Sequence, residues 1–248
     1  SVASKAAGFV ALVVLIYTAF PLSEAIWQPF IWVLSALTMT IGNVLALKQK
    51  NIVRMIAYSS ISQGGFVLMP LAVAGLVGSG STALRSVVLY MIVYAATNLG
   101  IFAVILAVSN KTRSGDVSSF GGLFSYAPAL GVLMTLFLAS LAGIPPLGGW
   151  IAKFVAFQSL IQSQSAWGYA LAIIGAVNSV VAFGYYGNVM REIWMRPVPD
   201  GDVTPITIPG SLRLALVITA GATLVFGVLP GVGLYFADLA EIAGAIIR

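Results

Sequence analysis

The sequence predicts an all-α protein, a bundle of transmembrane helices. Of its 248 residues, 60% are hydrophobic and 8% are charged, whereas soluble domains carry about 25% charged residues. Nearly uncharged runs of about 18 residues or more recur along the chain, long enough to cross a hydrocarbon core of about 30 Å. These runs are continuous and do not alternate polar with apolar residues, as the strands of a membrane barrel would.

We expect a single membrane domain, residues 1–248, with about eight membrane-crossing segments. The connections between them are short and either polar or rich in glycine, such as KQKN at 48–51. A last short helix is expected at 234–247. The eight apolar segments lie near residues 1–20, 28–47, 53–77, 84–108, 125–144, 148–164, 167–190 and 212–233.

The basic residues leave the orientation of these segments open. Cytoplasmic loops of membrane proteins are enriched in Lys and Arg. The count depends on whether 125–144 and 148–164 are two crossings or one interrupted crossing. If every segment crosses separately, one side holds Lys48, Lys50, Arg54, Lys111, Arg113 and Arg248, and the other holds Arg85, Arg191, Arg196 and Arg213.

Composition excludes several classes of function. The net charge is +5, but the basic residues lie mostly in loops, which favours contact with lipid headgroups over nucleic acid. The sequence has no His and no Cys, which excludes disulfides, thiolate chemistry and the usual zinc or haem ligation. The seven carboxylates show no metal-binding spacing, and neither a P-loop nor a dinucleotide fingerprint is present. We therefore predict no metal and no cofactor.

Two lysines, Lys5 and Lys153, lie inside apolar segments. An ionisable group at membrane depth is costly, so it marks a functional site by default. The alternative is that each lysine extends to the membrane surface along its aliphatic stem. This holds for Lys5 if it lies at a helix end, and for Lys153 if Pro145 and Pro146 form a surface turn.

A faint internal repeat favours the functional interpretation. The stretch KAAGF at 5–9 resembles KFVAF at 153–157, with a lysine, a small residue three positions later and a phenylalanine at the fourth. Transporter folds often contain repeats whose interrupted helices place functional groups near the bilayer midplane. The stretch SLAGIPPLGGWIAKF at 140–154 has the prolines and glycines that would interrupt a helix beside Lys153.

Longer motifs resemble a known family. The stretch ALTMTIGNVLALKQKNIVRMIAYSSISQGGFVLMPLAVAG at 36–75 is similar to the signature of the antiporter-like subunits of respiratory complex I. Residues 140–154 resemble the second signature of that family. The spacing GN-x-x-AL-x-Q, followed by R-M-x-AYSSIS, most resembles the N-type subunit of NADH-quinone oxidoreductase. VLYMIVYAATNLGIFAV at 88–104 fits between the signatures, and the resemblance covers about residues 1–195.

The resemblance implies a fold of about fourteen transmembrane helices in two inverted repeats, of which this chain would be the second part. Each repeat of the family has an interrupted helix with a buried lysine nearby, and Lys5 and Lys153 would be these lysines. Electron transfer occurs in other subunits, so this subunit would have no redox site or cofactor of its own. Its partners would be the other membrane-arm subunits and lipid, in the inner membrane of a bacterium.

These features together suggest a lateral proton relay. Burial disfavours the charged form of lysine, so a buried lysine can lose and regain a proton. Lys5 would take up a proton and pass it through ordered water to Lys153, which would release it. Polar side chains that bind such water could instead join helices. The candidates for the water chain are Asn43, Tyr58, Ser59, Ser60, Ser62, Gln63 and Asn98.

Two other functions remain open. An Mrp-type cation/proton antiporter shares both signatures, and the proteins that purify with the subunit would distinguish it from respiratory complex I. A structural membrane subunit that conducts no protons would tolerate neutral residues in place of Lys5 and Lys153.

Overall fold

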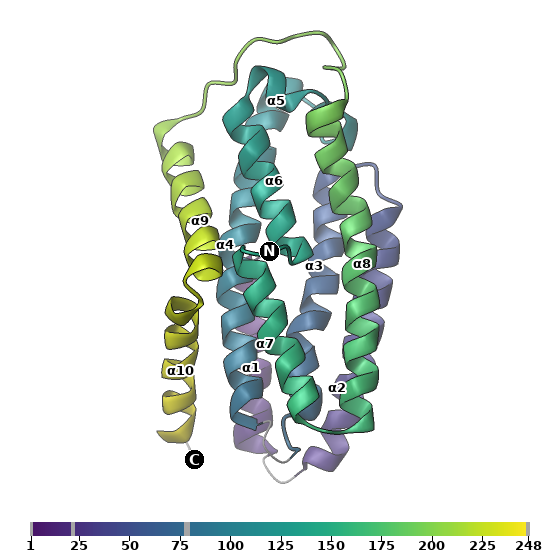
Figure 1. Ribbon diagram of the computed structural model, residues 1–248, viewed down its shortest axis with the longest axis vertical. Helices are drawn as coiled ribbons and strands as arrows, with labels where there is room; N and C mark the ends of the chain where they lie inside the picture. The colour runs from purple at the N-terminus through teal and green to yellow at the C-terminus, as the bar shows by residue number, and fades with distance from the viewer. Residues whose placement is uncertain (1, 21–22, 77–79, 247–248) are drawn as a thin grey trace.

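The structure is a computed structural model, and it describes residues 2–20, 23–76 and 80–246. Long helices stand side by side along one direction (Figure 1). The helices are α1 (Val2–Val14, continued by a π-helical turn Leu15–Ala19), α2 (Glu24–Leu47), α3 (Ile52–Leu68, continued by a 3₁₀ turn Met69–Val73), α4 (Gly80–Thr112), a 3₁₀ turn (Val117–Phe120), α5 (Leu123–Tyr126), α6 (Pro128–Ala142), α7 (Gly148–Gln162), α8 (Ala166–Met195), α9 (Gly210–Val228) and α10 (Pro230–Ile246).

Six of the described helices are long and apolar enough to cross a membrane, and they belong to α1, α2, α3, α4, α8 and α9. The predicted segments at 125–144 and 148–164 differ from these. Their helices α6 and α7 have 15 residues each, about 22 Å, which is too short for a bilayer core of about 30 Å. The two helices lie end to end (Figure 1). They form one interrupted crossing, which is one of the two arrangements that the sequence left open.

The C-terminal boundary also differs from the prediction. We expected a helix at 212–233 and another at 234–247, whereas α9 ends at Val228 and α10 begins at Pro230. Proline has no N–H and favours the first position of a helix, so Pro230 ends one helix and starts the next. Figure 1 shows α10 continuing below α9.

Helix α3 lies at the centre of the bundle. In its apolar stretch 78% of the residues are buried, against 6% in that of α1. Close packing on α2 depends on small residues, as is common between membrane helices. A Cβ atom on Gly42 would lie 2.6 Å from the backbone nitrogen of Ser62, and one on Gly65 would lie 2.7 Å from that of Met39. The two helix backbones therefore touch where the first signature motif lies.

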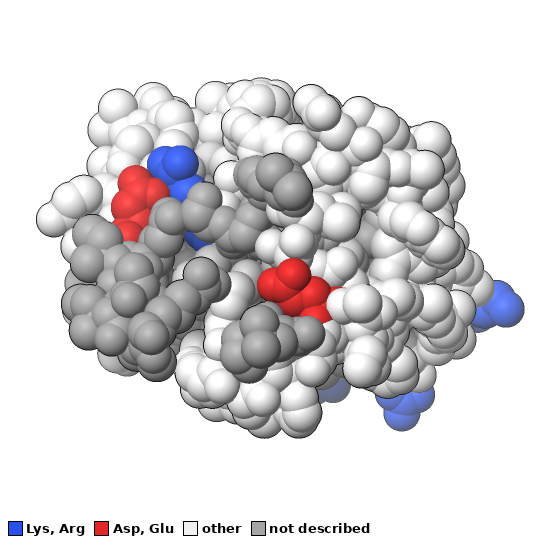
Figure 2. Space-filling view, turned by 90° about the horizontal axis from the view of Figure 1, so that it is seen from below, with Lys and Arg blue, Asp and Glu red and all other residues white. Residues whose placement is uncertain are grey.

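The charged residues gather at one end of the bundle. Backbone hydrogen bonds join the segments there, from Val117 N–H to the Lys50 carbonyl and from Gly122 N–H to the Glu192 carbonyl. Figure 2, which looks onto the opposite end, shows mostly uncharged residues among those described. The division of basic residues into six and four holds only if every segment crosses separately, and it does not apply here because α6 and α7 share one crossing. Eight of the twelve lie at the charged end: Lys48, Lys50, Arg54, Lys111, Arg113, Arg191, Arg196 and Arg213.

Candidate functional site

The break between α6 and α7 is built by glycines and prolines, as the sequence predicts. Gly143 follows the last residue of α6 with φ +93°, a left-handed conformation that suits glycine at a helix end. Its N–H donates to the carbonyls of Ala139 and Ser140. Helix α7 then starts at Gly148, and a Cβ on Gly149 would overlap the carbonyl oxygen of Ser140. Only glycine lets the first turn of α7 touch the last turn of α6.

Lys153 lies in the interior of the protein beside this break. The residue is 6% exposed, and its Nζ donates a 3.0 Å hydrogen bond to the carbonyl of Ala142. The Nζ also lies 3.5 Å from Ser179 Oγ and 4.8 Å from the ring centroid of Phe66. A long helical side chain leans toward the N-terminus of its helix, which brings Lys153 back to the end of α6. The carbonyls there lack helical partners and form the negative end of the helix dipole.

Lys5 contacts α3 and α4 from α1. It is partly buried, and its Nζ donates to the carbonyl of Ser60 at 2.5 Å and to the Ser60 hydroxyl. The same Nζ lies 5.8 Å from the ring centroid of Tyr94. None of the ion pairs found among the described residues includes Lys5 or Lys153. Backbone carbonyls and aromatic rings, rather than carboxylates, surround both amines.

A buried polar network centred on Gln63 lies between the two lysines. Its side-chain amide donates to the Tyr186 hydroxyl at 3.2 Å and to the Leu141 carbonyl at 3.3 Å. It accepts a 2.5 Å hydrogen bond from the Tyr90 hydroxyl. Tyr186 is also hydrogen bonded to Ser59. The network therefore ends on one side at Ser59, which is next in sequence to Ser60, the partner of Lys5. On the other side it ends at Leu141, which is next to Ala142, the partner of Lys153.

A second buried network joins α2 to α8. The amide of Asn43 donates to the side-chain and backbone oxygens of Asn178, both at 2.9 Å. The Tyr185 hydroxyl donates to Asn43 at 3.0 Å, and the amide of Asn178 donates to Thr40 at 3.2 Å. Hydrogen bonds of this kind hold membrane helices together. Asn43 therefore takes part in joining helices, and the rings of Tyr185 and Tyr186, 4.5 Å apart, are where this network touches the first.

Three predicted residues lie apart from these networks. The Ser62 hydroxyl and both side-chain amide atoms of Asn98 are buried and have no hydrogen-bond partner among the described residues. Buried polar atoms usually bind protein or ordered water, so these two positions suit water. Tyr58 is only half-buried. It lies where α3 packs on α2, since its carbonyl oxygen would be 3.0 Å from a Cβ on Gly42.

The sequence interpretation missed the tyrosines. Tyr90 and Tyr186 are buried at 4% and 0% exposure and both bind Gln63. Within an apolar helix, tyrosine is as well explained by packing as by hydrogen bonding. The Tyr186 contact joins residues 123 positions apart. Its only sequence signal is a hydroxyl within an otherwise apolar span, which does not identify a partner.

Changing Gln63 to leucine tests the first network. The change leaves the Tyr90 hydroxyl and the Leu141 carbonyl without a partner, at about 1–3 kcal/mol for each buried group. The proton relay predicted from the sequence implies that coupled proton uptake falls about tenfold in the assembled complex, measured in vesicles at equal subunit content. Asn178→Leu is the matched control, because its side chain binds Asn43 and Thr40 in the second network. Equal loss in the two variants would mean that helix joining, not the path between the lysines, limits uptake.

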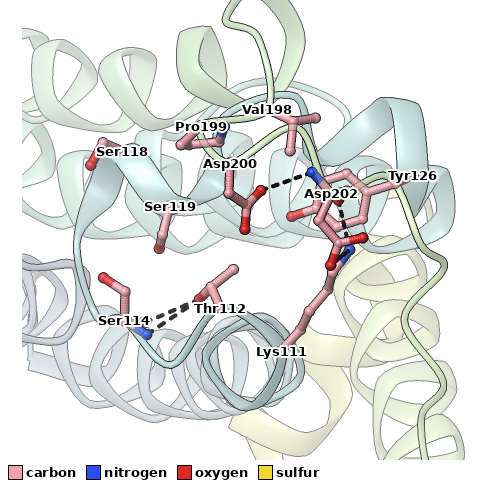
Figure 3. Close-up of a pocket in the computed structure, with 10 residues that line it drawn as sticks. All are labelled: Lys111, Thr112, Ser114, Ser118, Ser119, Tyr126, Val198, Pro199, Asp200 and Asp202. Carbon is pink, nitrogen blue, oxygen red and sulfur yellow. Dashed lines mark hydrogen bonds and ion pairs between the residues drawn. The ribbon is translucent and has the colours of Figure 1, made fainter.

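A pocket of about 260 Å³ lies at the charged end, below the segment that joins α8 to α9 (Figure 3). Lys111 Nζ donates to the carbonyls of Asp202 and Thr204 at 2.9 and 2.6 Å and lies 4.1 Å from the ring centroid of Tyr126. Hydrogen bonds from the backbone and hydroxyl of Thr204 hold the pKa of Asp202 below its ordinary value. The contacts fasten the α8–α9 connection across the helix ends, away from the two lysines.

A bundle of membrane-crossing helices with a broken helix, a lysine buried at the break and polar networks inside it defines a multi-pass membrane protein with a polar interior. Comparison with known proteins agrees. The family described as "NADH:quinone oxidoreductase/Mrp antiporter, TM" matches residues 1–180, and the chain belongs to this family. The resemblance stated from the motifs is thereby confirmed.

The alignments with individual relatives cover most of this chain but only part of each relative. NADH-quinone oxidoreductase subunit N of Trichlorobacter lovleyi is 40% identical over 242 residues, which are 97% of this chain and 48% of the relative. A chain of respiratory complex I from Thermus thermophilus has a TM-score of 0.69 and 27% identity, over 84% of this chain and 45% of that one. A chain of the Mrp complex from Dietzia has a TM-score of 0.76 and 19% identity, over 88% and 47%, which shows a common fold. The chain spans about half the length of the curated relatives it matches.

Proposed function

We propose that this chain is part of the N-type membrane subunit of a bacterial NADH-quinone oxidoreductase and moves protons across the inner membrane while other subunits transfer electrons. The 40% identity to subunit N of Trichlorobacter lovleyi supports the assignment to the N-type. The other membrane-arm subunits and lipid would be its partners. In this proposal the chain has no redox site of its own, and its contribution is the proton path.

The observation that carries this proposal is the position of Lys153. A lysine that is 6% exposed, without a carboxylate partner and held by the carbonyl of Ala142, is costly to keep charged. Burial favours the neutral form of the Lys153 amine, whereas the carbonyls at the end of α6 favour the charged form. A small movement of α6 or of a nearby charge can therefore change the protonation state of Lys153. Such a group can load and release a proton in each catalytic cycle.

The route between the lysines follows the first network. Lys5 binds Ser60, the next residue Ser59 binds Tyr186, and Tyr186 binds Gln63. Gln63 binds the Leu141 carbonyl, adjacent to the carbonyl that holds Lys153. An amide does not carry protons itself, so water must complete the path. The unpartnered buried atoms of Ser62 and Asn98, outside the first network, are further positions that suit ordered water.

We further propose that the charged end of the bundle faces the cytoplasm, because eight basic residues gather there. The 248 residues contain no cysteine, so single cysteines can report sidedness. We expect Ser118→Cys, at the charged end, to react with an impermeant maleimide in inverted vesicles only. Gln162→Cys, at the end of α7, should react in spheroplasts only. The reverse labelling pattern would show that the charged end faces away from the cytoplasm.

A subunit of an Mrp-type antiporter is the second candidate function. It is supported by the family to which the chain belongs, because that family includes both kinds of complex. Purification of the intact complex through a tag on this subunit distinguishes the two. Flavin and iron–sulfur subunits in the purified complex indicate NADH-quinone oxidoreductase, and small membrane subunits alone indicate an antiporter. The proton path is tested in the same complex in liposomes, by comparing proton uptake in the wild type and in Lys153→Met. Equal uptake in the two would favour a structural subunit that conducts no protons.

A further inference from the structure

Helix α9 packs directly against the break beside Lys153, although it lies beyond residues 1–180, which the family matches. A Cβ on Gly227 would overlap the carbonyl oxygen of Pro146 and lie 2.6 Å from the Cα of Leu147. One turn earlier, the carbonyl oxygen of Thr223 would lie 3.1 Å from a Cβ on Gly148. The backbones of α9 and of the break are therefore in contact over a full helical turn.

A chain of buried hydroxyls links the first turn of α7 to this helix. The N–H of Gly149 donates to Ser140 Oγ at 3.0 Å. Ser140 Oγ lies 3.4 Å from Thr97 Oγ1, which lies 3.3 Å from Thr223 Oγ1. Thr223 donates to the backbone carbonyl of Thr219 at 2.8 Å. Ser140, Thr97 and Thr223 are all 0% exposed.

The direction of these hydrogen bonds is fixed by their two ends. A hydroxyl has one proton to donate. Thr223 donates its proton to the Thr219 carbonyl, so it must accept from Thr97, and Thr97 must then accept from Ser140. Each hydroxyl donates once and accepts once, and the N–H of Gly149, which has no partner inside its own helix, is satisfied from α6. The chain ends on the backbone of α9.

We propose that Thr223 of α9 is a positioning residue for Lys153. Its hydroxyl completes the chain that holds the start of α7, and the place of that start sets where the Lys153 amine meets the carbonyls of α6. The functional part of the inference rests on the proposed proton path. The structural part, that α9 holds the first turn of α7, stands on the contacts alone and is measured separately.

The test uses the intact complex with three substitutions. Thr223→Val keeps the shape of the side chain and removes the hydroxyl, Thr223→Ser restores the hydroxyl, and Thr219→Val is the matched control. Thr219 is one turn away, and its hydroxyl bonds only carbonyls of its own helix. Hydrogen–deuterium exchange of residues 148–152 is measured by mass spectrometry, together with proton uptake per NADH oxidised in liposomes.

We expect Thr223→Val to raise the exchange rate at 148–152 about tenfold, because Thr97 is left as an unpartnered buried donor. Proton uptake per NADH should fall in the same variant. Thr223→Ser and Thr219→Val should match the wild type in both measurements.

Exchange in Thr223→Val equal to that in Thr219→Val would overturn the inference. Faster exchange with unchanged uptake, in a complex whose uptake does depend on Lys153, would also overturn the positioning role. Unchanged uptake in Lys153→Met would instead refute the proposed proton path, and exchange alone would then decide the role of α9.

Discussion

Replacing Lys153 with methionine is expected to reduce coupled proton uptake to less than about a tenth of the wild-type rate, a loss of at least about 1.4 kcal/mol of effective barrier. Methionine matches the apolar stem of lysine, so packing around the stem should be retained, while the amine that lies over the Phe66 ring and exchanges a proton is lost. The rate is measured as proton uptake alongside NADH oxidation in liposomes that contain the intact complex. Subunit content is quantified in the same preparation.

Two control variants separate a relay from a structural cation. Lys153→Arg keeps a positive charge and hydrogen-bond donors near the Ala142 carbonyl, but arginine does not release its proton in proteins. We expect uptake to be lost in this variant as well. Lys48→Met removes an exposed lysine at the end of α2 and should leave uptake unchanged. Normal uptake in Lys153→Arg would mean that the site needs a charge and not a transferable proton.

Gly149→Ala is expected to prevent stable assembly of the subunit. The added Cβ would overlap the carbonyl oxygen of Ser140, a backbone atom that cannot rotate away. Overpacking of this kind costs about 3 kcal/mol at the upper end of its usual range, because two helix ends must separate. The amount of folded subunit in the membrane and its thermal unfolding midpoint in detergent would both fall.

The control for this change is Gly221→Ala, in α9. A Cβ at Gly221 would meet nothing within 4 Å, so the change should alter stability by less than about 1 kcal/mol. If Gly149→Ala assembled and unfolded like Gly221→Ala, the contact between α6 and α7 would not require glycine. The break would then have to tolerate a shift of its first turn.

Most of the fold could be predicted because long apolar runs in a sequence indicate membrane helices. The break could be predicted as well, since Pro145, Pro146 and the glycines around them cannot continue a helix. The number of crossings could not be predicted from the same signal. Helix α6 is apolar like a complete span, and only the lengths of α6 and α7 and their end-to-end arrangement show that the two halves share one crossing.

The candidate site was predictable in part. Lys5, Lys153, Ser59, Ser60 and Gln63 stand out because they are polar within apolar segments, and the structure brings them near one another. Their partners on other helices did not stand out. Tyr186, Ser179 and Thr223 are far from these residues in the chain, and only the packing of α8 and α9 brings them close.

The hydroxyl chain beside Lys153 also has an electrical consequence. A proton moves along a row of hydroxyls only if every member can afterwards turn round and receive the next proton. Here one end is the amide N–H of Gly149, which cannot accept a proton, and the other is a carbonyl on α9. The row therefore has a single orientation and acts as an insulator. In the proposed proton path, the row would hold the broken helix together near Lys153 without offering the proton a second route.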